Sequence, residues 1–165
     1  MSYNDLEKYI SYKFKNIELL DQALTHKSYD NKLNNERLEF LGDSLLNVVI
    51  SHYLYQRFSN EKEGLLTRMR AQLVKAETLT QKAEDLGLQE HIKLSKGTAN
   101  LSKDRKNSIL EDAFEAVIGA IFIDSGWDIT NSTILNFFKK ELAALSSDMT
   151  FKDSKTELQE YLQSI

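Results

Sequence analysis

Acidic side chains stand at helical spacing in two otherwise apolar segments of this sequence. Glu36, Glu39 and Asp43 occupy positions i, i+3 and i+7, so on a helix they fall within a sector of about 60°. In the second segment, Asp112 and Glu115 are at i and i+3 and also share a helix face. If the two helices pack against each other, four or five carboxylates converge on one place.

Such a convergence is costly unless something neutralises it. Two carboxylates about 4 Å apart repel by about 4 kcal/mol at an effective dielectric constant near 20. Relief comes from protonation or from bound cations, and oxygen-only ligands suit Mg²⁺ or Mn²⁺. None of the three histidines lies three or four residues from these acids, which disfavours zinc and a carboxylate-bridged redox bundle. The chain has no cysteine, which excludes disulfides, thiolate zinc sites and cysteine nucleophiles.

The residues alone leave two alternatives open. Acids in the first turn of a helix are stabilised by the helix dipole and by capping, which explains Glu36 and in part Glu39 without any metal. That explanation does not reach Asp43, which lies two turns into the segment between two small residues. On the second helix, Glu111 is at i−4 from Glu115 and would pair with it as well as Asp112 does.

The elements that must position these acids are predicted to be helices, because proline is absent and helical periodicity dominates. We expect helices near Tyr3–Ser11, Ile17–His26, Glu36–Phe58, Glu63–Leu86, Ser108–Ser125 and Ile129–Leu145, with a loop from Ser95 to Lys106. The segments Leu38–Ile50 and Ile109–Ile123 are apolar on almost every face, so both are expected in the middle of an all-α protein.

The bulk composition places limits on location and partners. The N-terminus lacks the pattern of a signal peptide, and the longest apolar run is interrupted by Glu115 and too short to span a bilayer. We therefore expect a cytoplasmic protein with no membrane partner. The net charge of −4 does not by itself favour a nucleic-acid binder, since phosphate contacts need clustered Lys and Arg.

Four segments, in order, resemble the ribonuclease III family over essentially the whole chain. NERLEFLGDSLL (35–46) is similar to the family signature, THKSY (25–29) precedes it, and EGLLTRMRAQLV (63–74) follows. SILEDAFEAVIGAIFIDSG (108–126) resembles the second acidic motif of the family. The resemblance implies the dimeric, all-helical endonuclease-domain fold of ribonuclease III.

The resemblance also assigns roles to matching positions. The carboxylates that hold Mg²⁺ in the family, with Mn²⁺ able to substitute, correspond to Glu39, Asp43, Asp112 and Glu115. Of these, Asp43 and Glu115 are expected to be the most sensitive catalytic positions, and Asp112 rather than Glu111 matches the family acid. Further acids, for substrate or a second metal, correspond to Glu36 and Glu63. The aromatic that inserts into a partner subunit corresponds to Phe40.

The implied activity is Mg²⁺-dependent endonucleolytic cleavage of double-stranded RNA in rRNA and mRNA processing. The products would carry 5′-phosphate and 3′-hydroxyl ends with short 3′ overhangs. Basic candidates for contact with RNA phosphates are Lys103, Arg105 and Lys106. We interpret residues 1–150 as the catalytic domain and 151–165 as a linker and the start of a truncated or absent double-stranded-RNA-binding domain. The competing hypothesis is a non-enzymatic RNA-binding relative.

Overall fold

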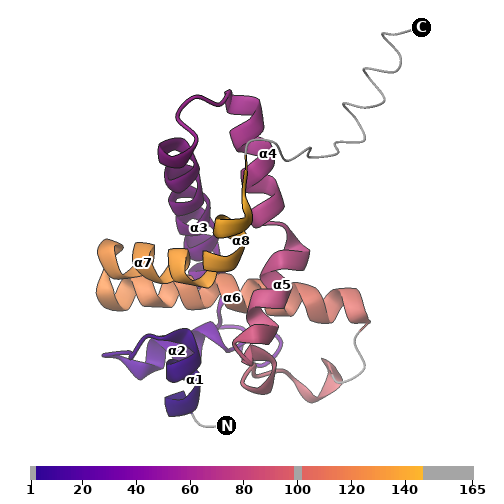
Figure 1. Ribbon diagram of the computed structural model, residues 1–165. Helices are drawn as coiled ribbons and strands as arrows, with labels where there is room; N and C mark the ends of the chain where they lie inside the picture. Colours follow the sequence, from indigo (N-terminus) through magenta and orange to yellow (C-terminus); the bar gives the residue numbers. More distant parts are fainter. Residues whose placement is uncertain (1–2, 99–101, 147–165) are drawn as a thin grey trace, which may run out of the picture.

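The computed structural model describes residues 3–98 and 102–146, and within them the chain is helical (Figure 1). The elements are α1 (Tyr3–Ile10), α2 (Ile17–Ala23), α3 (Glu36–Arg57), α4 (Glu63–Leu73), α5 (Ala76–Asp85), α6 (Lys103–Ser125), α7 (Trp127–Phe137) and α8 (Lys139–Ala144), with 3₁₀ turns η1 (Leu88–Glu90) and η2 (Lys96–Thr98). These ranges contain no β-strand, and their one β-type pairing is an isolated bridge between Thr25 and Lys93. The all-α prediction is confirmed, while the interpretation of residues 151–165 lies outside the described residues.

Helix α6 is the centre of the fold. It runs across the molecule and contacts α2, α3, α5 and α7, with α3 crossing it steeply (Figure 1). Every residue from 113 to 121 is buried, as expected for a helix that is apolar on all sides. No helix of the described residues is long and apolar enough to cross a membrane.

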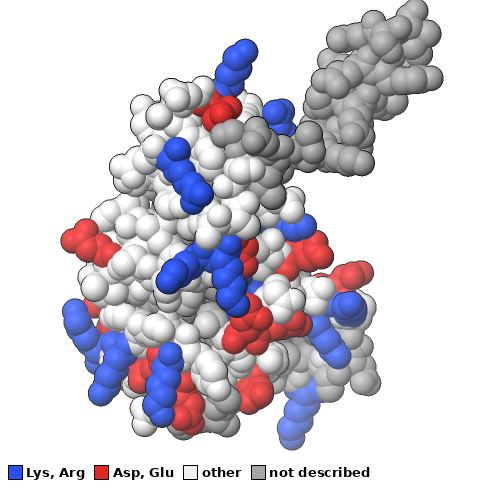
Figure 2. Space-filling model, viewed as in Figure 1, with Lys and Arg blue, Asp and Glu red and all other residues white. Residues whose placement is uncertain are grey.

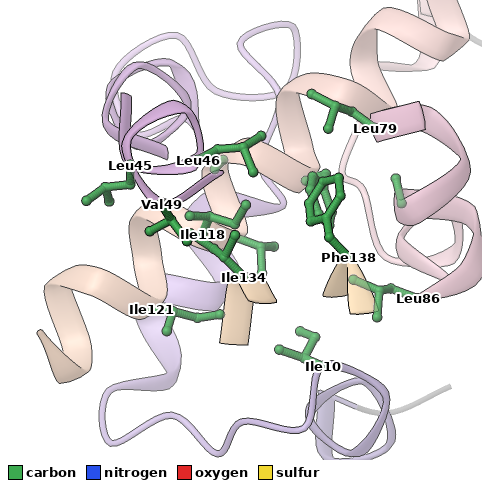
Figure 3. Close-up of a cluster of buried hydrophobic side chains, with 14 of the residues drawn as sticks. Ile10, Leu45, Leu46, Val49, Leu79, Leu86, Ile118, Ile121, Ile134 and Phe138 are labelled. Atoms are coloured by element: carbon green, nitrogen blue, oxygen red, sulfur yellow. The ribbon is translucent and has the colours of Figure 1, made fainter. Parts of the chain in front are cut away.

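The hydrophobic core fixes how α3 and α6 cross. Figure 3 shows side chains of α3 meeting those of α6 and α7, with Phe138, Leu79 of α5 and Leu86 just after α5 continuing the cluster beside them. The labelled members are Ile10, Leu45, Leu46, Val49, Leu79, Leu86, Ile118, Ile121, Ile134 and Phe138. Burying each large aliphatic side chain contributes about 1.5–3 kcal/mol, so the crossing is held by many such contacts.

Helix α3 is not buried on all sides, contrary to the expectation from its sequence. Phe40 is 77 % exposed, Val48 54 % and Tyr55 72 %. At 100° per residue these three side chains fall within about 80° of one another, so they form one apolar outer face. The composition of α3 therefore reflects two apolar faces, one in the core of this chain and one exposed to solvent.

Several element boundaries differ from the sequence expectation, including the end of α2 at Ala23 instead of His26. The single helix expected over Glu63–Leu86 is wrong: α4 ends at Leu73 and α5 begins at Ala76. Lys75 between them has extended backbone (φ −68°, ψ 149°), because α4 packs against α3 whereas α5 packs against α6 and the chain must turn. The last expected helix is likewise divided into α7 and α8.

The loop expected up to Lys106 ends earlier. Helix α6 begins at Lys103, and the Ser102 side chain accepts a hydrogen bond of 3.4 Å from the backbone N–H of Arg105. A serine at this position satisfies a free N–H of the first turn, which allows the helix to start before the apolar run. The basic residues Lys103, Arg105 and Lys106 therefore lie on a helix and have fixed directions.

Candidate active site

The two acid-bearing helices touch through their backbones. A Cβ atom placed on Gly42 of α3 would lie 1.8 Å from the carbonyl oxygen of Glu115, and one on Gly119 of α6 would lie 2.2 Å from the carbonyl oxygen of Leu38. Real Cβ contacts essentially never fall below 3.0 Å, so both positions require glycine for the close approach. Asp43 is the next residue after Gly42, so this backbone contact brings Asp43 close to Glu115.

The carboxylates predicted from the sequence meet at this crossing. Glu115 is only 9 % exposed, and its acidic neighbours are, in decreasing strength, Asp43, Glu111, Glu39 and Asp112. Burial first, and then repulsion from these acids, raises the pKa of Glu115 from 4.5 to about 8. Among the described residues, Glu115 makes no hydrogen bond or ion pair. The site thus holds a buried carboxyl group with no positive partner of its own.

Glu39 and Asp112 belong to the same cluster but lie near a cation. Burial, then Asp112 and Glu36, raise the pKa of Glu39, while Lys27 opposes the rise. Burial also raises the pKa of Asp112, although His26 and Lys27 act against it. The Nζ atom of Lys27 lies 2.8 Å from Glu36 Oε1, which makes Lys27 the cation of this side of the cluster.

Two residues of the site were missed by the sequence prediction. Lys27 lies in the THKSY segment, but nothing in its spacing to the acids indicated that it would reach them. Glu111 was set aside in favour of Asp112, yet it is half-buried, and burial followed by Asp112 and Asp43 raises its pKa. Its i, i+4 spacing to Glu115 was the available signal.

The donor set suits a hard divalent cation, because all of its ligating atoms would be carboxylate oxygens. In the conformation described, no three His, Asp or Glu side chains of residues 3–98 and 102–146 have the geometry of a metal site. Asp43 Oδ1 instead accepts a hydrogen bond of 2.7 Å from Asn47 Nδ2. The backbones of the two helices are in contact at this point, so the carboxylates of Asp43 and Glu115 start from neighbouring positions on α3 and α6.

The other predicted residues have separate places. Glu63 begins α4 and accepts a hydrogen bond of 2.6 Å from Thr67 Oγ1. It lines a cavity of about 210 Å³ between α3 and α4, together with Tyr55 and Arg70. Tyr55 is twelve residues beyond Asp43, about 18 Å along α3, so a single chain does not bring Glu63 to the acidic cluster.

The three basic candidates point in different directions. Arg105 acts on the charge of His26, which in turn is a neighbour of Asp112, so Arg105 lies on the side of the acidic cluster. Lys103 and Lys106 instead line a cavity of about 430 Å³ with residues of α5 and η1. The structure therefore separates Arg105 from the two lysines.

Comparison with known proteins agrees with this architecture. The family model described as Ribonuclease-III-like matches residues 16–142. A protein named Ribonuclease 3 from Hahella chejuensis is 47 % identical over 158 residues, covering 96 % of this chain and 70 % of its own length. Another of that name from Shewanella baltica is 49 % identical over 154 residues, covering 93 % and 68 %. The chain belongs to the ribonuclease III family.

Solved structures of ribonuclease III proteins have the same fold. The nuclease domain of ribonuclease III from Campylobacter jejuni superposes with a TM-score of 0.80 at 40 % identity, covering 84 % of this chain and 97 % of that one. The Campylobacter jejuni domain shows structural flexibility in a region that is involved in dimer formation. Dicer from Pichia stipitis superposes with a TM-score of 0.63 at 30 % identity, covering 87 % of this chain and 65 % of Dicer. The expected ribonuclease III endonuclease-domain fold is confirmed.

Proposed function

We propose that this chain is a Mg²⁺-dependent endoribonuclease that cuts double-stranded RNA, with Mn²⁺ able to substitute for Mg²⁺. The observation that carries the proposal is the buried carboxyl group of Glu115, surrounded by acids at the contact of α3 and α6. A folded protein tolerates such a group when it is protonated or when a cation joins it. Membership of the ribonuclease III family favours the cation.

The proposed ligands are the four carboxylates of Glu39, Asp43, Asp112 and Glu115. Asp43 and Glu115, one from each helix, would hold the ion most directly, and the other two would complete the oxygen shell. When bound, Mg²⁺ supplies activation of water and stabilisation of the negative charge on the departing oxygen. The close α3–α6 contact would hold the carboxylates of the two helices beside one another. Products with 5′-phosphate and 3′-hydroxyl ends are expected.

RNA would approach along the cationic side of the acidic cluster. Lys27 and Arg105 are the basic residues of that side, so we propose them as phosphate contacts. Lys103 and Lys106 stay weaker candidates, because they line a different cavity. The face drawn in Figure 2 mixes acidic and basic side chains without a broad basic patch. A-form RNA offers its phosphates and 2′-hydroxyls, so base sequence should matter little.

The protein is proposed to act as a homodimer through the outer face of α3. Phe40, Val48 and Tyr55 are exposed apolar side chains on one face of α3, and contiguous apolar surface of this kind marks interaction sites. The cavity of about 210 Å³ beside Tyr55 is large enough to admit the ring of Phe40 from a second subunit. In such a dimer, Glu63 and Glu36 are proposed as accessory acids for substrate or a second metal. The natural substrates would be rRNA and mRNA precursors, and the location the cytoplasm.

The proposal is tested by incubating the protein with long duplex RNA in Mg²⁺, in Mn²⁺ and in EDTA. Cleavage into short duplexes with 3′ overhangs is expected with either metal and none in EDTA. A single-stranded RNA of the same sequence should be cut far more slowly. If duplex RNA is bound but remains intact at every Mg²⁺ and Mn²⁺ concentration, the non-enzymatic RNA-binding alternative is correct.

A further inference from the structure

The acidic cluster is supplied with protein cations on one side only. Lys27 forms an ion pair with Glu36, and its charge also acts on Glu39 and Asp112. His26, when it is protonated, is a second positively charged neighbour of Asp112. By contrast, every charged group that acts on Glu115 or on Glu111 is an acid, and Lys27 is not among them. The cluster therefore has a compensated half, made of Glu36, Glu39 and Asp112, and a half that lacks a counterion, which contains Glu111 and Glu115.

Glu111 lies in the half without a counterion. On α6 it precedes Glu115 by one turn and is offset from it by about 40°, whereas Asp112 is offset by about 60° in the other direction. Its charged neighbours are Asp112 and Asp43. Within the described part of the chain, Glu111 takes part in no ion pair and no hydrogen bond. A solvated surface glutamate would instead be exposed, and Glu111 is half-buried.

A second observation indicates that this half receives a ligand. The Glu115 side chain, more than nine-tenths buried, faces the same acids and has no hydrogen-bond partner among the described residues. Buried charged groups in proteins are normally paired or coordinate a metal. The close contact of Gly42 with the Glu115 backbone leaves no space between the two helices at this point.

We propose that Glu111 is an additional carboxylate of the divalent-cation site, and that it acts with Asp43 and Glu115 on the half of the cluster that Lys27 does not reach. The inference rests on the proposed metal-dependent function and extends it. A divalent ion bound without RNA occupies this half first, because no protein cation competes for its carboxylates. Affinity for divalent ions rises with the number of charged ligands, so Glu111 tightens this site.

The test measures Mn²⁺ binding by electron paramagnetic resonance, which detects free Mn²⁺, in the absence of RNA. Glu111→Gln is compared with two controls of the same chemistry. Glu36→Gln removes an acid of the compensated half, and Glu90→Gln removes an exposed acid on η1. Circular dichroism checks that each variant is folded. Loss of one partner in a metal site typically weakens binding about 10- to 100-fold, and we expect at least about tenfold for Glu111→Gln.

The controls define the alternatives. Glu36→Gln should weaken the tightest Mn²⁺ site less than Glu111→Gln does, and Glu90→Gln should leave it unchanged. If Glu111→Gln binds Mn²⁺ like Glu90→Gln, or if the unaltered protein binds none without RNA, the inference is overturned. The cleavage of duplex RNA by the unaltered protein is measured separately, so the failure of this inference and the failure of the proposed function give different results.

Discussion

Replacement of Gly42 by alanine should damage the site through geometry alone. The added Cβ would lie 1.8 Å from the carbonyl oxygen of Glu115, whereas such contacts need at least 3.0 Å. The helices must therefore separate locally by at least 3.0 − 1.8 = 1.2 Å. Both atoms involved are held by backbone, so neither can rotate away. Overpacking of this kind costs about 1–3 kcal/mol of unfolding free energy.

The same displacement moves Asp43 relative to Glu115. A shift of about 1 Å between catalytic groups can lower a rate about 100-fold, and we expect a loss of that order in the initial rate of duplex cleavage at saturating Mg²⁺. Unfolding free energies from denaturant titration and cleavage rates are measured on the same preparations. Gly97→Ala is the matched control, because a Cβ at Gly97 meets no atom within 4 Å.

A second variant keeps the test informative if Gly42→Ala fails to fold. At Gly119 the added Cβ would approach the carbonyl oxygen of Leu38 to 2.2 Å, which requires a separation of 3.0 − 2.2 = 0.8 Å. The expected order of damage is Gly42→Ala, then Gly119→Ala, then Gly97→Ala. Unfolding energy and cleavage equal to those of Gly97→Ala at both crossing positions would refute the idea that backbone contact positions the acids.

Three further predictions follow from the acids and from α3. Since burial and its acidic neighbours raise the pKa of Glu115 from 4.5 to about 8, the folded protein keeps a proton that the unfolded chain releases above pH 4.5. As far as this group is concerned, the stability of the metal-free protein should therefore be highest below pH 4.5 and should fall as the pH rises through 8. Thermal melts in EDTA that show no such fall would contradict this prediction. Added Mg²⁺ should reduce the loss of stability. Glu115→Gln should abolish cleavage yet raise the melting temperature of the metal-free protein at pH 8, whereas a lowered melting temperature would mean that the residue is structural. Phe40→Ala should weaken the dimer by about tenfold or more in sedimentation equilibrium, while an unchanged dissociation constant would exclude Phe40 from the interface.

Sequence spacing predicted the acidic cluster well because a helix fixes directions. Glu39 and Asp43 on α3, and Asp112 and Glu115 on α6, are each separated by about one turn, so the face they share follows from the helical period alone. The all-round apolar character of 113–121 likewise placed α6 in the centre. The packing of one helix on the other was a hypothesis that the Gly42 and Gly119 contacts now explain.

Features that depend on tertiary contacts were not predictable in this way. The break between α4 and α5 arises because each half packs on a different helix, and Lys75 carries no strong helix-breaking signal. Lys27 reaches the acids through the path of the chain between α2 and α3, which periodicity does not describe. The exposed face of α3 could not be told from a core face, since both are apolar in sequence.

The central claim is that Asp43 and Glu115 share a divalent ion. A crystal soaked in Mn²⁺ and measured at an X-ray energy where manganese scatters anomalously locates the ion directly. The account predicts an anomalous peak between the two carboxylates, at about 2.0–2.3 Å from an oxygen of each. A peak elsewhere on the protein, or none while Asp43 remains bonded to Asn47, would contradict it.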